Sequence, residues 1–154
     1  MKQLLLILSW VIASSVLADP FKTPPGVFNA VDDPEHPRYV ARIEAHSVVE
    51  IEALMSRAES VVDSILAGEQ VEPIQFVLHG DEVRFFFRRN YPQNKALVDR
   101  AARLDAFKVI DIKVCETWMR INNEGLSELY PFVDTVPFGP EEEKRLLSEG
   151  YLYF

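Results

Sequence analysis

The chain is poor in cysteine, because Cys115 is the only one among its 154 residues. A single cysteine excludes an intramolecular disulfide, so the fold depends on non-covalent packing alone. Outside the cytoplasm, where cysteines usually occur in pairs, a lone cysteine indicates an intermolecular disulfide or a free reactive thiol. The alternative is a buried thiol that packs as a small hydrophobic side chain. The compartment therefore decides how this thiol is interpreted.

Long apolar runs are also scarce. The N-terminal apolar stretch covers residues 4 to about 13, which is shorter than the ~20 residues that a membrane span needs. Lys2 precedes it, and Val16 and Ala18 supply small residues at a cleavage site. These features predict a signal peptide over residues 1–18, cleaved before Asp19, and a periplasmic or secreted protein without stable membrane insertion. The alternative is an uncleaved N-terminal anchor.

Positive charge is the third scarcity, with 16 lysines and arginines against 24 acidic residues. Cleavage after residue 18 would leave 136 residues with 15 basic and 24 acidic side chains, a net charge of −9. Such a charge argues against nucleic acids and anionic membrane surfaces as partners. The length suits one domain, and no repeat or linker divides the chain.

Alternating strand and helix patterns follow a proline-rich lead-in, which we assign to residues 19–38. The domain, residues 39–154, has strand patterns at 39–46, 73–79, 107–114, 132–138 and 151–154. Helical patterns cover residues 48–66, a short segment capped by Asp81, and residues 94–104, 116–122 and 139–149. This alternation predicts an α/β fold, a flavodoxin-like doubly wound sheet of about five mainly parallel strands with helices on both faces. We expect the strand order 2-1-3-4-5.

Charged residues interrupt two of the expected strands. Arg42 and Glu44 alternate with apolar residues in the first, and Asp111 and Lys113 do so in the third. Strands of a doubly wound sheet are normally apolar on both faces. One face is therefore expected to be partly open or covered by a partner subunit, which predicts a homo-oligomer.

The first three expected strands each end at a residue whose side chain can take part in catalysis: His46, His79 and Cys115. Ligands of doubly wound sheets bind at the carboxyl ends of the strands, so these residues should share one edge. A helix start favours the thiolate form of Cys115, whereas the neighbouring Glu116 opposes it. Each histidine also has a structural interpretation, in which His46 extends the cap formed by Ser47 or His79 stabilises a turn.

Several segments resemble the DsrE/DsrF-like sulfur-relay family, which includes the TusD-type sulfurtransferase subunits. "VLHGDEVRFFFRR" is similar to the family's strand–His–Gly–helix segment. "NKALVDRAARLDAFKVIDIKVCETWMR" resembles its third strand with the cysteine, and "FVDTVPFGPEEEKRLLSEGYLYF" its C-terminal strand, helix and aromatic strand. The resemblance covers residues 39–154. It implies a flavodoxin-like domain, often trimeric or hexameric, in which Cys115 carries persulfide sulfur and His79 matches a common family residue.

This exported, acidic chain departs from the cytoplasmic relay proteins, which argues against a tRNA-linked role, and it has no resolving cysteine. We therefore expect a periplasmic sulfur carrier or thiol-reactive protein. Cys115 would accept and pass sulfane sulfur, with His46 and His79 supporting the thiolate. Donor and acceptor proteins or small thiols would be its partners, and either carriage or sulfurtransferase catalysis fits. No organic cofactor or metal is expected. The alternatives are an oligomeric scaffold with an inert Cys115, and copper or zinc binding by the three residues.

Overall fold

A computed structural model of the chain describes residues 37–63, 67 and 71–154. The predicted signal peptide, residues 1–18, and the lead-in up to residue 36 lie outside this part. The strands are β1 (Tyr39–Val40), β2 (Ile74–Leu78), β3 (Ile110–Cys115), β4 (Val133–Val136) and β5 (Leu152–Tyr153). The α-helices are α1 (Val48–Glu59), α3 (Tyr91–Ala106), α4 (Glu116–Ile121) and α5 (Gly139–Ser148). Three short 3₁₀ segments are η1 (Asp81–Phe86), η2 (Arg88–Asn90) and η3 (Leu126–Glu128).

The five strands form one sheet in which every neighbouring pair is parallel. This arrangement confirms the α/β, flavodoxin-like class predicted from the sequence. The predicted strand order is wrong, since the observed order is β4-β3-β2-β1-β5. From β1 to β4 each new strand joins the same side of the sheet, and the last crossover returns β5 to the free side of β1. The central strand is therefore β2, which pairs with both β1 and β3.

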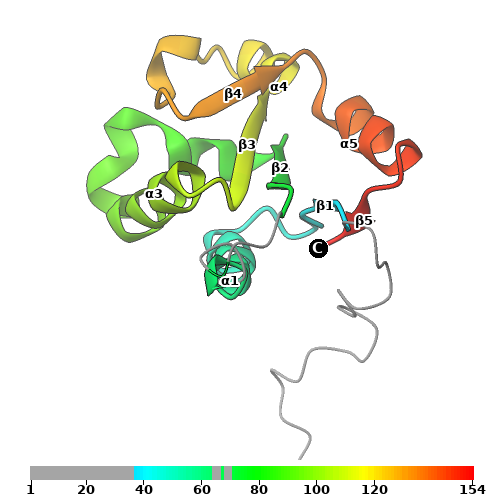
Figure 1. Cartoon of the computed structure of the whole chain (residues 1–154). Helices are drawn as coiled ribbons and strands as arrows, with labels where there is room; N and C mark the ends of the chain where they lie inside the picture. Colours follow the sequence, from blue (N-terminus) through cyan, green and yellow to red (C-terminus); the bar gives the residue numbers. More distant parts are fainter. Residues whose placement is uncertain (1–36, 64–66, 68–70) are drawn as a thin grey trace, which may run out of the picture.

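Helices cover both faces of the sheet, but unequally (Figure 1). On one face, α1 and α3 bury the larger core, to which β2 and β3 contribute the apolar residues Ile74, Phe76, Leu78, Ile110, Ile112 and Val114. On the other face, α5 buries a cluster of four residues, Val40, Val77, Val136 and Leu146. Most of the apolar burial, and thus most of the hydrophobic stabilisation, belongs to the α1/α3 face.

The α5 face carries the charges expected in the third strand. Asp111 and Lys113 alternate with the buried isoleucines of β3 and are partly exposed. Lys113 Nζ lies 3.5 Å from a carboxylate oxygen of Asp111 and 3.5 Å from one of Glu142 in α5. The lysine therefore joins the sheet to α5 through partly screened ion pairs, which are individually weak.

The first strand is much shorter than predicted, because the chain leaves the sheet after Val40. Arg42 and Glu44 thus belong to a loop, where they form an exposed ion pair with an N–O distance of 2.7 Å. The backbone N–H groups of Glu44 and Ala45 donate to the carboxylate of Glu50, at 2.8 and 3.0 Å. These bonds tie the segment to the first turn of α1 rather than to a neighbouring strand.

The predicted cap of the first helix is present. Ser47 is the N-cap residue of α1, and its Oγ accepts the N–H of Glu50 at 3.3 Å. The helix ends at Glu59, before the predicted end near residue 66, and residues 64–66 lie outside the described part. His46 precedes the cap and has a φ of +49°, in the left-handed region.

Candidate functional site

The connections after β3 and β4 leave the sheet in opposite directions. After β3 the chain enters α4, whose Met119 is buried in the α1/α3 core, whereas after β4 it enters α5 on the other face. Backbone N–H and Oγ1 of Thr117 both donate to the carbonyl of Pro137, at 3.2 and 2.8 Å. Divergent connections of neighbouring parallel strands create the crevice in which open α/β sheets bind ligands.

Cys115 lies where these connections diverge, as the last residue of β3 and the N-cap residue of α4. Its Sγ accepts the backbone N–H of Trp118 at 3.4 Å. Only 2% of Cys115 is exposed. The thiol thus occupies the predicted junction of strand and helix, but it is covered from solvent.

Gly139, the first residue of α5, lies between His79 and Cys115. A Cβ atom at this position would lie 2.7 Å from Cβ of His79 and 3.2 Å from Cβ of Cys115. Both distances are shorter than an ordinary contact of about 3.5–4.0 Å between carbon atoms. The absence of a side chain at Gly139 therefore allows α5 to begin against the thiol and the imidazole.

The two histidines are in direct contact. Their ring centroids are 5.1 Å apart, and the rings meet edge to face at 67°. His79 follows β2, and its Nε2 lies 3.8 Å from a carboxylate oxygen of Glu143 in α5. The predicted trio of His46, His79 and Cys115 thus lies together at one edge of the sheet. His79 is in the middle because β2, not β1, is central.

A buried glutamate completes the site. Glu82 is 0% exposed, and its Oε1 accepts the backbone N–H groups of His79 and Gly80 at 2.7 and 2.9 Å. Its Oε2 lies 2.7 Å from Nδ1 of His46. The prediction that Asp81 caps this segment is wrong, since Gly80 is the N-cap residue and no side chain caps it there. Glu82 was not predicted as a site residue, although "HGDE" places a carboxylate close to the turn after β2.

The arginines of the "RFFFRR" segment are paired with acidic or carbonyl groups rather than left as a cationic surface. Arg84 and Arg89 both donate to the carboxylate of Glu124, at 2.9 Å and 2.7–2.8 Å, and Arg88 donates to the carbonyl of Leu129. Hydrogen bonding to Arg89 lowers the pKa of Glu124 and raises the pKa of Arg89. These contacts stabilise the surface near α4 and neutralise its positive charge.

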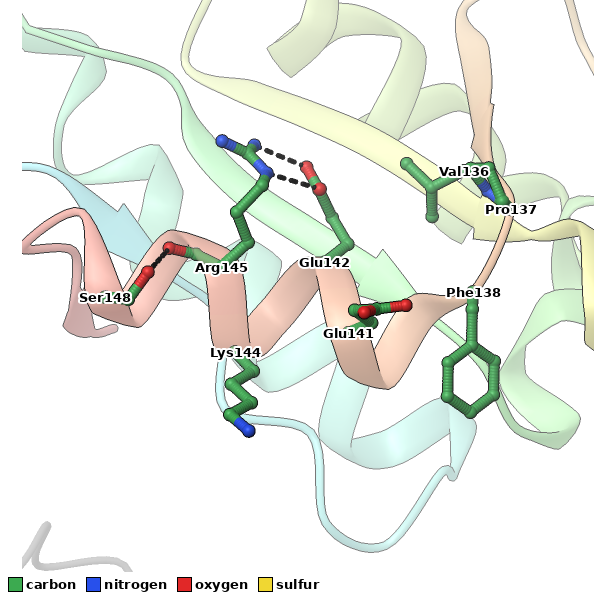
Figure 2. Close-up of a pocket in the computed structure, with 8 residues that line it drawn as sticks. All are labelled: Val136, Pro137, Phe138, Glu141, Glu142, Lys144, Arg145 and Ser148. Carbon is green, nitrogen blue, oxygen red and sulfur yellow. Dashed lines mark hydrogen bonds and ion pairs between the residues drawn. The ribbon is translucent and has the colours of Figure 1, made fainter.

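A shallow pocket of about 520 Å³ lies between the end of β4 and α5, and its lining does not include Cys115 or either histidine. Its lining comes from the end of β4, Val136 to Phe138, and from the exposed side of α5. Figure 2 shows Glu142 and Arg145 facing each other, with Phe138 directed away from them. The paired hydrogen bonds from Arg145, at 2.8 and 2.9 Å, lower the pKa of Glu142. The charges of Glu142 and Arg145 in the wall of the pocket therefore compensate each other.

Two further structural findings concern only residues 37–63, 67 and 71–154. No group of three or more His, Cys, Asp or Glu side chains is arranged there to hold a metal ion. In the same part of the chain, no helix is long and apolar enough to cross a membrane.

The fold and site define a doubly wound α/β domain with a thiol and two histidines at the carboxyl edge of its sheet. No protein-family profile matches the chain, and no curated protein is significantly similar to it in sequence. Its structure is similar to that of MTH1491 from Methanobacterium thermoautotrophicum, a protein of unknown function. The TM-score is 0.58 at 20% sequence identity, and the match covers 77% of this chain and 97% of MTH1491. At this identity the similarity shows the fold alone.

Proposed function

We propose that the protein is an exported sulfur carrier in which Cys115 accepts sulfane sulfur as a persulfide and passes it to another thiol. The observation that carries this proposal is the packing of His79 and Cys115 against the same glycine, at the crevice where such sheets bind ligands. In this proposal the His79 imidazole takes the proton of the thiol, whose Sγ accepts the Trp118 N–H at 3.4 Å.

Loading needs no net oxidation. The Cys115 thiolate attacks the outer sulfur of a donor persulfide, R–S–SH, and forms a new S–S bond. The S–S bond of the donor breaks, and the donor leaves as the thiolate R–S⁻ with the electron pair. The proton removed from Cys115 passes to His79 and then to the departing thiolate or to solvent.

The compartment and assembly state are part of the same proposal. The short N-terminal apolar stretch and the cleavage pattern ending at Ala18 support export to the periplasm or beyond. The exposed apolar side chains of edge strand β5, Leu152 and Tyr153, support association of identical subunits. Donor and acceptor are then proteins or small thiols of the same compartment.

Mass spectrometry of the intact protein tests the proposal. Incubation with cysteine persulfide should add about 32 Da, one sulfur atom, and fragmentation should place it on Cys115. The variant Cys115→Ser is the control and should gain no mass. An unmodified wild-type protein after incubation with excess donor would refute sulfur carriage.

The burial of Cys115 favours a second candidate, a non-catalytic oligomeric scaffold in which the thiol only packs. With 2% exposure, such a thiol would be protected from reagents in the folded protein. Alkylation by iodoacetamide separates the two candidates, because the chain has one cysteine and the readout is unambiguous. The carrier should react in the native state, whereas the scaffold should react only after unfolding in urea.

A further inference from the structure

Glu82 holds an unusual position for a glutamate, since its side chain is fully buried beside the turn that follows β2. A buried carboxylate requires hydrogen-bond donors, and this one has three. The N–H groups of His79 and Gly80 occupy Oε1, and Nδ1 of His46 lies 2.7 Å from Oε2. An ionised carboxylate can only accept hydrogen bonds, and with Glu82 in that form the proton of this contact lies on Nδ1 of His46.

This contact determines the chemistry of the other ring nitrogen. With the proton on Nδ1, a neutral His46 has its lone pair on Nε2. The His46 side chain is 32% exposed, in contrast to the buried thiol. A carboxylate that orients a partly exposed imidazole is the arrangement of a general base.

The backbone supports the same conclusion. His46 has a φ of +49°, a conformation that costs energy for a residue with a side chain and that is often kept at functional sites. A Cβ atom on Gly80 would lie 2.5 Å from Nδ1 of His46 and 2.7 Å from Oε2 of Glu82. The left-handed backbone of His46 and the absence of a side chain at Gly80 thus both allow the contact between the imidazole and the carboxylate.

We propose that His46 is the general base for unloading the carrier and that Glu82 is its positioning residue. This inference rests on the proposed function and assigns the acceptor to the class of thiols. Nε2 of His46 takes the proton of an acceptor thiol, R′–SH, and the thiolate attacks the outer sulfur of the Cys115 persulfide. The bond between that sulfur and Sγ breaks, R′–S–SH forms, and Cys115 leaves as a thiolate.

The two histidines thereby have different tasks. His79 flanks Cys115 across Gly139 and serves the thiol itself. His46 contacts His79 at a ring separation of 5.1 Å, and its side chain is the more exposed of the two, at 32% against 22%. Within the part of the chain that the structure describes, His79 has only a longer contact with a carboxylate, since its Nε2 is 3.8 Å from Glu143.

The substitution Glu82→Gln tests the positioning role. The amide oxygen can still accept the two backbone N–H groups, but its NH₂ group would donate to Nδ1 of His46. The proton of His46 should therefore move to Nε2, a switch of tautomer that ¹⁵N-detected NMR of the imidazole reports. Glu124→Gln is the matched control, because it changes another largely buried carboxylate and should leave the His46 tautomer unchanged.

Transfer kinetics test the catalytic role of His46. After loading with cysteine persulfide and removal of the donor, unloading to a different thiol, glutathione, is followed by mass, as Cys115 returns to its unmodified form and glutathione persulfide appears. Glu82→Gln should slow this step roughly 100-fold or more, whereas Glu124→Gln should not. His46→Asn provides a second variant, because asparagine tolerates the left-handed backbone, and it should slow unloading equally.

The outcomes separate this inference from the proposed function. If the wild type loads sulfur and both Glu82→Gln and His46→Asn unload at the wild-type rate, the role of His46 is refuted while sulfur carriage stands. An unchanged His46 tautomer in folded Glu82→Gln refutes the positioning role. If the wild type never loads, the proposed function fails and the unloading role fails with it.

Discussion

The substitution Gly139→Ala gives a direct measure of how closely α5 packs on the site. The added Cβ would lie 2.7 Å from Cβ of His79, about 1 Å inside an ordinary contact, and 3.2 Å from Cβ of Cys115. Neither neighbour can rotate away, because a Cβ atom is fixed to the backbone. Overpacking of this kind costs about 1–3 kcal/mol, and the better helix propensity of alanine returns less than about 1 kcal/mol at a helix end. We expect a net destabilisation of about 1–2 kcal/mol.

Urea unfolding followed by circular dichroism measures this effect. With a slope of about 2 kcal/mol per molar urea, within the usual range of about 1–3, the midpoint should fall by roughly 0.5–1 M. Gly125→Ala is the control, since its Cβ would meet only Oγ of Ser127, at 3.5 Å, and its φ of −89° suits any residue. His79→Ala keeps the Cβ and should not relieve the clash, whereas His79→Gly should. Equal midpoints for Gly139→Ala and Gly125→Ala would refute the close packing of α5 against the site.

Two further predictions concern stability away from the site. Glu124→Gln should lower the urea midpoint at pH 7, because Arg89 holds the pKa of Glu124 below its ordinary value of 4.5. A lowered pKa in the folded state stabilises the folded protein at pH values above 4.5, and this stabilisation is lost as the pH falls through the lowered pKa. The urea midpoints of wild type and variant should therefore converge in acid. A difference in urea midpoint between wild type and variant that stays constant at all pH values would contradict this pH dependence. Leu104→Ala, in the α1/α3 core, should cost about 2–5 kcal/mol, whereas Leu146→Ala, in the four-residue cluster under α5, should fall at or below the low end of that range. Urea unfolding of both variants compares the two faces, and a larger loss at Leu146 would contradict the ranking.

The sequence predicted those parts of the fold that depend on local pattern. The apolar runs at Ile74–Leu78 and Ile110–Cys115 became the central strands because their alternate residues fill the α1/α3 core. The alternation in residues 41–45 was misleading for a physical reason. Ala41 is buried in the same core and Ile43 packs against it, so a loop lying on the core imitates the period of a strand.

Strand order could not be predicted in the same way. Neighbours in a parallel sheet are selected by the packing of crossover helices, and the residues of β1 and β2 contain no local signal for their partner. The candidate site was predicted in part, because residue chemistry at strand ends indicates where Cys115 and His79 should lie. Glu82 was missed since its role comes from tertiary contacts: a glutamate in a short polar segment becomes important only once it is buried against His46.

The unequal cores have a kinetic consequence for the thiol. Helix α5 is held to the sheet by four buried apolar residues, and its first residue covers Cys115. Elements with few buried contacts open at a lower free energy than the rest of a domain, so α5 should exchange its amide hydrogens before α1 and α3 do. If the protein is the proposed carrier, reagents meet the sulfur during these openings, and the rate of thiol modification should follow the opening equilibrium of α5. The small cluster beneath this helix would thereby set how often the thiol is available for reaction.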